Sequence, residues 1–140
     1  MLYFAYGSNM NHEQMSKRCP CSKYTKRGYL QDYKFVYDGY SSMRGGAVAN
    51  VMKSNGGVVW GGIFKINEDG LLALDRYEGY PNSYDRKEVN IIDDSKTISK
   101  AIVYYRINKE IGQPSEEYRQ VVIKGANDCN LPEDYIKSYL

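Results

Sequence analysis

The chain has 140 residues, 42% of them hydrophobic and 26% charged, a composition typical of a folded globular protein and not of a disordered or fibrous one. Its 19 basic and 17 acidic side chains leave a net charge of +2, which is too balanced to indicate a nucleic-acid partner or a basic membrane-binding arm. No apolar run approaches the roughly 20 residues of a membrane span, and Met1–Met10 has no basic leader. We therefore expect a cytoplasmic protein whose residues 1–140 form one domain.

The N-terminal segment predicts a strand followed by a short helix. Leu2–Tyr6 is an apolar run that ends at the turn-forming residues Gly7-Ser8-Asn9, as expected of a strand that enters a turn. Asn11 has the character of a helix N-cap, with Gln14 three residues later. A helix is therefore expected over Asn11–Arg18, and Pro20 should end it.

The middle of the chain predicts three strands and one clear helix. The strands are expected at Tyr29–Tyr40, Ala47–Met52 and Val58–Ile66, with glycine pairs at 45–46, 56–57 and 61–62 as turns or bulges. Asn67 can cap a helix that ends at Glu78, and Gly79 suits the left-handed residue after it. Its apolar face is expected to contain Leu71, Leu74 and Tyr77, widened by Leu72.

The last third predicts a strand pair and a further helix. Tyr84–Ile92 and Ile98–Ile107 are strand-like, and Ser115 can cap a helix over Glu116–Gly125 with Tyr118, Val121 and Val122 on one face. The tail, Leu131–Leu140, is expected to fold back on the body. Strands and helices do not alternate regularly, which argues against a doubly wound parallel sheet. The pattern instead favours an α+β fold with a mixed, strongly twisted sheet or small β-barrel.

Cysteine and histidine usage excludes several kinds of site. The three cysteines, Cys19, Cys21 and Cys129, are an odd number without zinc-site spacing, which argues against a disulfide framework and a metal site. His12 is the only histidine and is expected to be a solvated helix residue. We therefore assign any acid–base chemistry to a carboxylate or to one of the 15 tyrosines.

Two segments can carry such chemistry. The turn Tyr6-Gly7-Ser8-Asn9 joins a strand to a helix, where free backbone N–H groups can hold a carboxylate or an oxyanion; an ordinary turn is the alternative. Glu78 ends a helix, so the helix dipole and any burial would both raise its pKa. The alternative for Glu78 is a solvated carboxylate or a partner of Arg76 or Arg86.

Several fragments together resemble the γ-glutamylcyclotransferase family in its broad sense, which includes the AIG2-like proteins. The resemblance runs over nearly the whole chain, and its most specific fragments are the first and the Leu74–Gly79 stretch. The fragments are Tyr6-Gly7-Ser8-Asn9-Met10, Arg18-Cys19-Pro20, Gly46-Ala47-Val48-Ala49-Asn50-Val51, Val59-Trp60-Gly61, Leu74-Asp75-Arg76-Tyr77-Glu78-Gly79, Tyr84-Asp85-Arg86, Pro114-Ser115-Glu116-Glu117-Tyr118, Gly125-Ala126 and Leu131-Pro132-Glu133-Asp134-Tyr135.

The resemblance implies a small β-barrel with helices packed around it and a pocket at its mouth. It also implies that Glu78 is the catalytic acid and base, and that a small γ-glutamyl substrate is bound by the residues Tyr6, Gly7, Ser8, Asn9, Tyr84 and Tyr104. Tyr105 could take the place of Tyr104 by a slip of one residue. The oligomeric state, monomer or homodimer, stays open.

The implied reaction is intramolecular: the substrate's α-amino group attacks its own γ-carbonyl and expels an amine, which gives 5-oxoproline. It implies no metal and no cofactor, which suits a chain with one histidine. The Tyr-Gly-Ser-Asn loop differs from the Tyr-Gly-Ser-Leu of glutathione-degrading relatives and the Tyr-Gly-Thr-Leu of γ-glutamylamine relatives, which favours γ-glutamyl amino acids. The leaving-amine pocket is expected in loops such as Lys53–Gly57 and Tyr80–Ser83. Two alternatives are a non-catalytic protein that binds a γ-glutamyl ligand or a partner, and a hydrolase that pairs Glu78 with Asp75 or Asp85.

Overall fold

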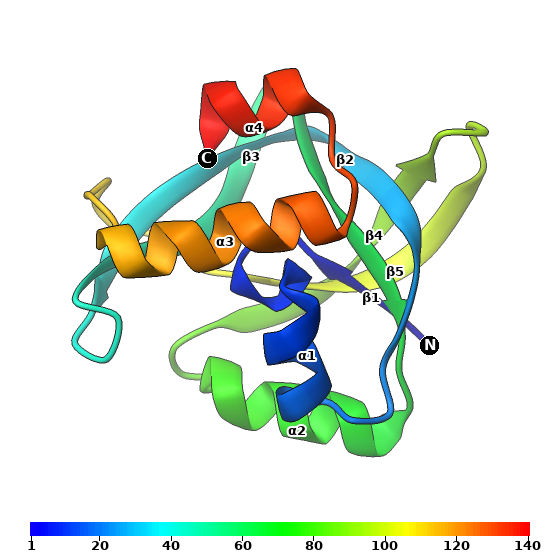
Figure 1. Ribbon diagram of the computed structural model, residues 1–140, viewed down its shortest axis with the longest axis horizontal. Coiled ribbons are helices and arrows are strands. Elements are labelled where there is room, and N and C mark those ends of the chain that lie inside the picture. The colour runs from blue at the N-terminus through cyan, green and yellow to red at the C-terminus, as the bar shows by residue number, and fades with distance from the viewer.

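Two long strands, paired as one bent hairpin, make up most of the barrel wall in the computed structural model, which describes all residues 1–140 (Figure 1). The five strands are β1 (Leu2–Ala5), β2 (Lys23–Ser41), β3 (Gly46–Lys65), β4 (Asp85–Asp93) and β5 (Ile98–Tyr105). They close in the order β1-β3-β2-β4-β5. Neighbours are antiparallel except β1 and β5, which run parallel, so the expected mixed barrel of an α+β fold is confirmed.

The strand predicted to break at the glycine pair 56–57 is continuous. Ala47–Met52 and Val58–Ile66 belong to the single strand β3, and β2 begins six residues before the predicted Tyr29. The pairing of β2 with β3 shifts register between Gln31 and Tyr33. Gly56 takes a φ of +80° there, and its N–H donates to Asp32. The glycines therefore form a bulge that bends the hairpin, as sequence alone allowed but did not decide.

Helices cover the outside of the barrel. They are the short 3-10 helix η1 (Ser8–Met10), α1 (His12–Arg18), α2 (Glu68–Glu78), α3 (Glu116–Asp128) and α4 (Glu133–Tyr139). In Figure 1, α3 lies across the barrel, with α1 and α2 below it and α4 above. The predicted caps are confirmed, because the side chains of Asn11, Asn67 and Ser115 each accept a hydrogen bond from the N–H three residues later. The tail forms α4 as it folds back.

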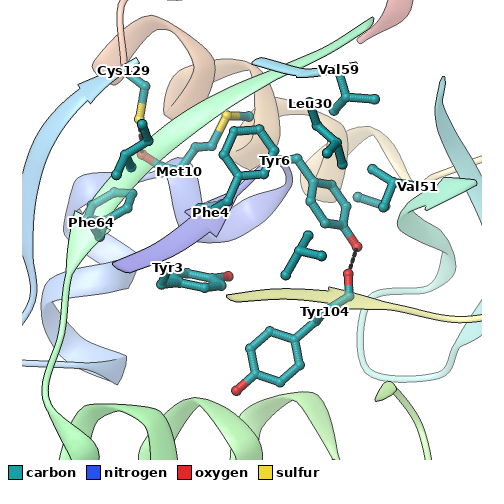
Figure 2. Packing of buried hydrophobic residues seen from close by; sticks show 14 of the residues in the cluster. Tyr3, Phe4, Tyr6, Met10, Leu30, Val51, Val59, Phe64, Tyr104 and Cys129 are labelled. Atoms are coloured by element: carbon teal, nitrogen blue, oxygen red, sulfur yellow. Dashed lines mark hydrogen bonds between the residues drawn. The ribbon is translucent and has the colours of Figure 1, made fainter. Parts of the chain in front are cut away.

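The core fills the barrel interior and continues beneath α3 (Figure 2). On α2, however, only Gly70 and Leu74 are buried, whereas Leu72 and Tyr77 are 56% and 57% exposed. The predicted apolar face was therefore too wide. Tyr77 is exposed because its ring stacks against the guanidinium of Arg18 and not against the core.

His12 is not the solvated residue expected from the sequence. Its ring packs 4.9 Å from the ring of Tyr24 and 5.8 Å from that of Phe64, between centroids. Its Nε2 lies 3.7 Å from the sulfur of Cys129. Helix α1 begins against the barrel wall, so the first side chain of the helix is held between aromatic rings. The three cysteines are free, as expected.

None of the helices combines the length and the apolar character that crossing a lipid bilayer requires.

Candidate active site

A cavity of about 420 Å³ opens where β1, α1, α2, α3 and the turn between β2 and β3 come together. All seven predicted site residues line it: Glu78, Tyr6, Gly7, Ser8, Asn9, Tyr84 and Tyr104. The sequence did not point to several others. These are Tyr3, Arg18, Arg44, Arg76, Arg106 and Tyr118, together with Tyr40–Met43, Val48, Ala49, Tyr77 and Gly79.

The loop after β1 forms one wall. Gly7 is required there, since a Cβ at this position would lie 2.8 Å from the Cβ of Ala49 on β3. The N–H groups of Met10 and Asn11 donate back to the carbonyls of Gly7 and Ser8, which winds the loop into η1. The N–H of Gly7 makes no hydrogen bond within the protein, and a first helical turn leaves such donors free for a ligand.

Glu78 reaches the cavity from the end of α2. Buried Leu74 anchors this helix on the barrel, and left-handed Gly79 ends it immediately after Glu78. The Glu78 carboxyl forms no salt bridge; its Oε1 accepts a hydrogen bond of 3.2 Å from Asn9 Nδ2. The alternative of an ion pair with Arg76 or Arg86 is therefore wrong, and Arg86 pairs with Asp75 instead. The alternative of a fully solvated carboxylate is also wrong, because Glu78 is half-buried in the cavity lining.

Burial raises the pKa of Glu78 to about 7, against the opposing effect of nearby positive charge. Arg18, Arg106 and Arg44 each lower it, as does the hydrogen bond from Asn9. The loss of hydration therefore raises the pKa of Glu78 by more than the three guanidinium groups and the Asn9 donor together lower it. A carboxyl with this pKa can take up and return a proton near neutrality, as a general acid and base must.

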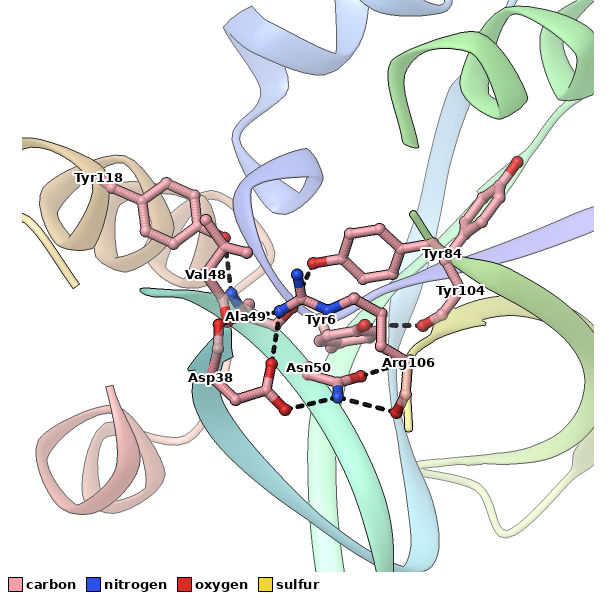
Figure 3. Close-up of polar contacts among 9 residues, drawn as sticks. All are labelled: Tyr6, Asp38, Val48, Ala49, Asn50, Tyr84, Tyr104, Arg106 and Tyr118. Atoms are coloured by element: carbon pink, nitrogen blue, oxygen red, sulfur yellow. Dashed lines mark hydrogen bonds and ion pairs between the residues drawn. The ribbon is translucent and has the colours of Figure 1, made fainter. Parts of the chain in front are cut away.

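Arg106 is fixed by a buried polar network on the pocket floor (Figure 3). Its guanidinium pairs with Asp38 and lies 4.6 Å from the centre of the Tyr84 ring. Asn50 connects the two, because its side chain donates to Asp38 at 2.7 Å and accepts from the Arg106 N–H at 3.0 Å. The charge of Arg106 is thus neutralised within the protein.

The predicted pocket tyrosines have committed their hydroxyl protons to the protein. Tyr6 donates to the carbonyl of Tyr104, Tyr84 to the carbonyl of Ala49, and Tyr104 to the carboxylate of Asp75, each at 2.7 Å. Burial raises the pKa of all three phenols, so they stay protonated. They shape the pocket and can accept a hydrogen bond, but their donors are not free to orient a ligand.

Two of the sequence-based expectations about neighbouring residues need correction or refinement. Asp75 and Asp85 do not line the cavity, and Asp75 is held by Arg86 at 2.9 Å, so no carboxylate pair forms with Glu78. Of the expected leaving-group loops, Lys53–Gly57 lies within β3 away from the cavity. From Tyr80–Ser83, only Ser83 lines it.

The missed residues differ in how well the sequence could have revealed them. Arg18 and Tyr118 lie in the fragments that carry the family resemblance, so a signal for them was present. Arg44 belongs to no recognisable sequence motif. Arg106 comes directly after a strand, and no neighbouring residue indicates a functional role for it. Both reach the pocket only through the pairing of distant strands.

Fold and site together define a small-molecule acid–base site: one protonatable carboxyl faces a glycine-containing loop at the mouth of a closed mixed barrel. Residues 58–139 match the model of the AIG2-like family. The γ-glutamylcyclotransferase of Bos taurus is 33% identical over 97% of this chain and 75% of its own length. That of Homo sapiens is 32% identical over 96% and 74%.

Solved structures agree. A γ-glutamyl cyclotransferase superposes with a TM-score of 0.94 at 30% identity, covering 100% of this chain and 88% of the other. The Bacillus subtilis protein YkqA shares the fold, with a TM-score of 0.83 at 21% identity over 98% of this chain and 51% of its own. The chain belongs to the γ-glutamylcyclotransferase and AIG2-like family.

Proposed function

We propose that this protein is a γ-glutamylcyclotransferase in which Glu78 moves the protons, and that residues 1–140 act as one catalytic domain. The observation that carries the proposal is the hydrogen bond of 3.2 Å from Asn9 Nδ2 of the loop to Glu78 Oε1, which joins two residues of the cavity lining. It brings a carboxyl of near-neutral pKa to a loop with unused backbone donors. The family membership supports the same reaction.

The substrate supplies its own nucleophile. Its α-ammonium group gives a proton to the Glu78 carboxylate, and the freed amine attacks the γ-carbonyl carbon to form a five-membered ring. The protein need only hold the chain folded, because a tethered nucleophile already has a high effective concentration. A cavity of about 420 Å³ is large enough for a γ-glutamyl compound and small enough to restrict its shape.

Collapse of the tetrahedral intermediate completes the reaction. The protonated Glu78 returns its proton to the leaving nitrogen as the C–N bond breaks, and the second proton of the attacking nitrogen follows to the departing amine. Two protons thus pass from the attacking to the leaving nitrogen, and Glu78 ends as it began. In this proposal the N–H of Gly7, which has no partner in the protein, and its neighbours in the loop stabilise the oxyanion between these steps.

A panel of γ-glutamyl compounds, with γ-glutamyl amino acids first, tests the proposal by assay for 5-oxoproline. Release of 5-oxoproline and free amine in equal amounts is the expected result. Release of glutamate in its place would identify a hydrolase. Measurable binding without any turnover would identify a binding protein on the same scaffold, and either outcome would overturn the proposal.

A further inference from the structure

Positive charge exceeds negative charge in the cavity. Four arginines line it, Arg18, Arg44, Arg76 and Arg106, against the single carboxyl of Glu78. Asp38 neutralises Arg106, and Arg76 is exposed to solvent. Arg18 and Arg44 remain, both partly buried and neither in a salt bridge with any carboxylate of the chain. Two such charges call for an anionic ligand, since an unpaired charge away from water is costly.

Arg44 is held in a defined position in the cavity lining. It lies within the turn between β2 and β3, residues 42–45, and its Nη2 donates to Gln14 Oε1 at 2.8 Å. Its guanidinium lies 5.1 Å from the centre of the Tyr118 ring. Its Nε and Nη1 make no hydrogen bond, so one edge of the planar group is free for a carboxylate.

Gln14 connects this arginine to the catalytic loop. While its Oε1 accepts from Arg44, its Nε2 donates to Ser8 Oγ at 2.8 Å and to Asn9 Oδ1 at 3.0 Å. The distance from loop to guanidinium is therefore set by one rigid amide. A ligand bound by both the loop and the Arg44 guanidinium would therefore be selected by its length as well as by its charge.

Arg18 belongs to the loop side of the cavity. Its Nη1 donates to Asn9 Oδ1 at 3.3 Å, and its guanidinium stacks 4.8 Å from the centre of the Tyr77 ring. This position suits the α-carboxylate, which every γ-glutamyl compound carries. Arg44 is then left without a carboxylate partner unless the leaving amine brings a second carboxylate.

We propose that Arg44 is a specificity-determining residue that binds a carboxylate on the leaving amine, so that substrates carrying one are preferred to γ-glutamyl compounds of simple amines. The inference rests on the proposed function. The charges fit it: Arg18 and Arg44 match two carboxylates, and the substrate's ammonium faces Glu78. A compound with one carboxylate would leave Arg44 unpaired in a partly buried place.

The test compares γ-glutamylalanine with γ-glutamylethylamide, which differ only in the carboxylate of the leaving group. We expect the wild type to favour γ-glutamylalanine by about 10- to 100-fold in kcat/KM, the usual worth of a charge-assisted hydrogen bond. In Arg44→Met the ratio should fall to within about threefold of unity, and Arg44→Lys should give an intermediate ratio. Arg76→Met is the matched control, and it should keep the wild-type ratio.

A binding measurement separates this inference from the proposed function. Calorimetric titration of the two compounds into Glu78→Gln, with and without Arg44→Met, requires no turnover. Preference for γ-glutamylalanine that disappears with Arg44→Met supports the role of Arg44 even if no 5-oxoproline forms. Equal binding of both compounds to Glu78→Gln, or a preference lost in Arg76→Met but kept in Arg44→Met, overturns it. Circular dichroism verifies that each variant is folded.

Discussion

Asn9 donates its side-chain amide to Glu78 Oε1 across 3.2 Å, so the loop after the first strand meets the end of α2 although 69 residues separate them. The orientation of the Asn9 amide is fixed by the hydrogen bonds that its oxygen accepts. Asn9 Oδ1 accepts from Gln14 at 3.0 Å and from Arg18 at 3.3 Å, so its NH₂ group must face Glu78 and Tyr3. The carboxyl is thus held by a donor that favours its charged form while its surroundings favour the neutral one.

Replacing Glu78 should abolish turnover without unfolding the protein. Glu78→Gln keeps an oxygen that can accept from Asn9 but cannot carry a proton between nitrogens. We expect 5-oxoproline release to fall by at least about 100-fold, as for loss of a general acid and base. Glu110→Gln, at an exposed position outside the cavity, is the control and should retain full activity. Near-normal release by folded Glu78→Gln would remove Glu78 from its role.

The same variant should gain stability in a pH-dependent way. Folding raises the pKa of Glu78 from its ordinary value of 4.5 to about 7, so the native state binds the proton more tightly than the unfolded state. The stability of the wild type must then fall as the pH rises from about 4.5 through 7. Glutamine does not ionise, so its stability does not fall in this way. Glu78→Gln should therefore be more stable than the wild type at pH 8, by up to about 3 kcal/mol.

Urea denaturation at pH 4 and pH 8 measures that gain. The difference between Glu78→Gln and the wild type should shrink toward zero at pH 4, where Glu78 is protonated in both states. A difference of the same size at both pH values would show that burial does not perturb this carboxyl. Glu110→Gln should match the wild type at each pH.

The rate should depend on pH through the carboxylate form of Glu78. Below its pKa of about 7, the fraction able to accept a proton falls about tenfold per pH unit. We therefore expect kcat/KM to rise about tenfold per unit on the acidic side and to level off above neutrality. Initial rates of 5-oxoproline release between pH 5 and 8 give the profile, and a flat one would contradict the assignment.

Asn9→Ala should move that profile. Losing the donor removes one of the contacts that lower the pKa of Glu78, so the inflection should move to higher pH, by less than about one unit. Because Asn9 is buried, losing its side-chain hydrogen bonds should also lower the free energy of unfolding by about 1–3 kcal/mol. Asn127→Ala, exposed on α3, should leave the inflection unchanged. A shift to lower pH would mean that Asn9 does not favour the carboxylate.

Asp75→Asn tests whether a second carboxylate takes part. Asp75 accepts from Arg86 and Tyr104 behind the pocket wall, so its loss should cost about 1–2 kcal/mol of stability and leave 5-oxoproline as the product. Mass spectrometry of the products decides. Glutamate released by the wild type and lost in Asp75→Asn would instead support the carboxylate-pair hydrolase.

Local chemistry explains what the sequence could and could not predict. Asn67 and Gly79 bound a helix through short-range capping, so the position of Glu78 at its end followed directly. Whether β3 broke or bent at Gly56 depended on its pairing with β2, which no short window contains. Arg44 and Arg106 reach the cavity by that same long-range pairing. The sequence alone therefore could not predict that these two arginines contribute to the positive charge of the cavity.

The hairpin of β2 and β3 has an evolutionary consequence. Its tip, Ser41–Gly45, is the stretch of chain that presents Arg44, and it lies far along the sequence from the helix that ends at Glu78. Hairpin tips tolerate insertion and exchange better than the elements beneath them. Exchange of this tip would therefore change which leaving amine the enzyme prefers, while Glu78 and the proton transfer that it carries out stay the same.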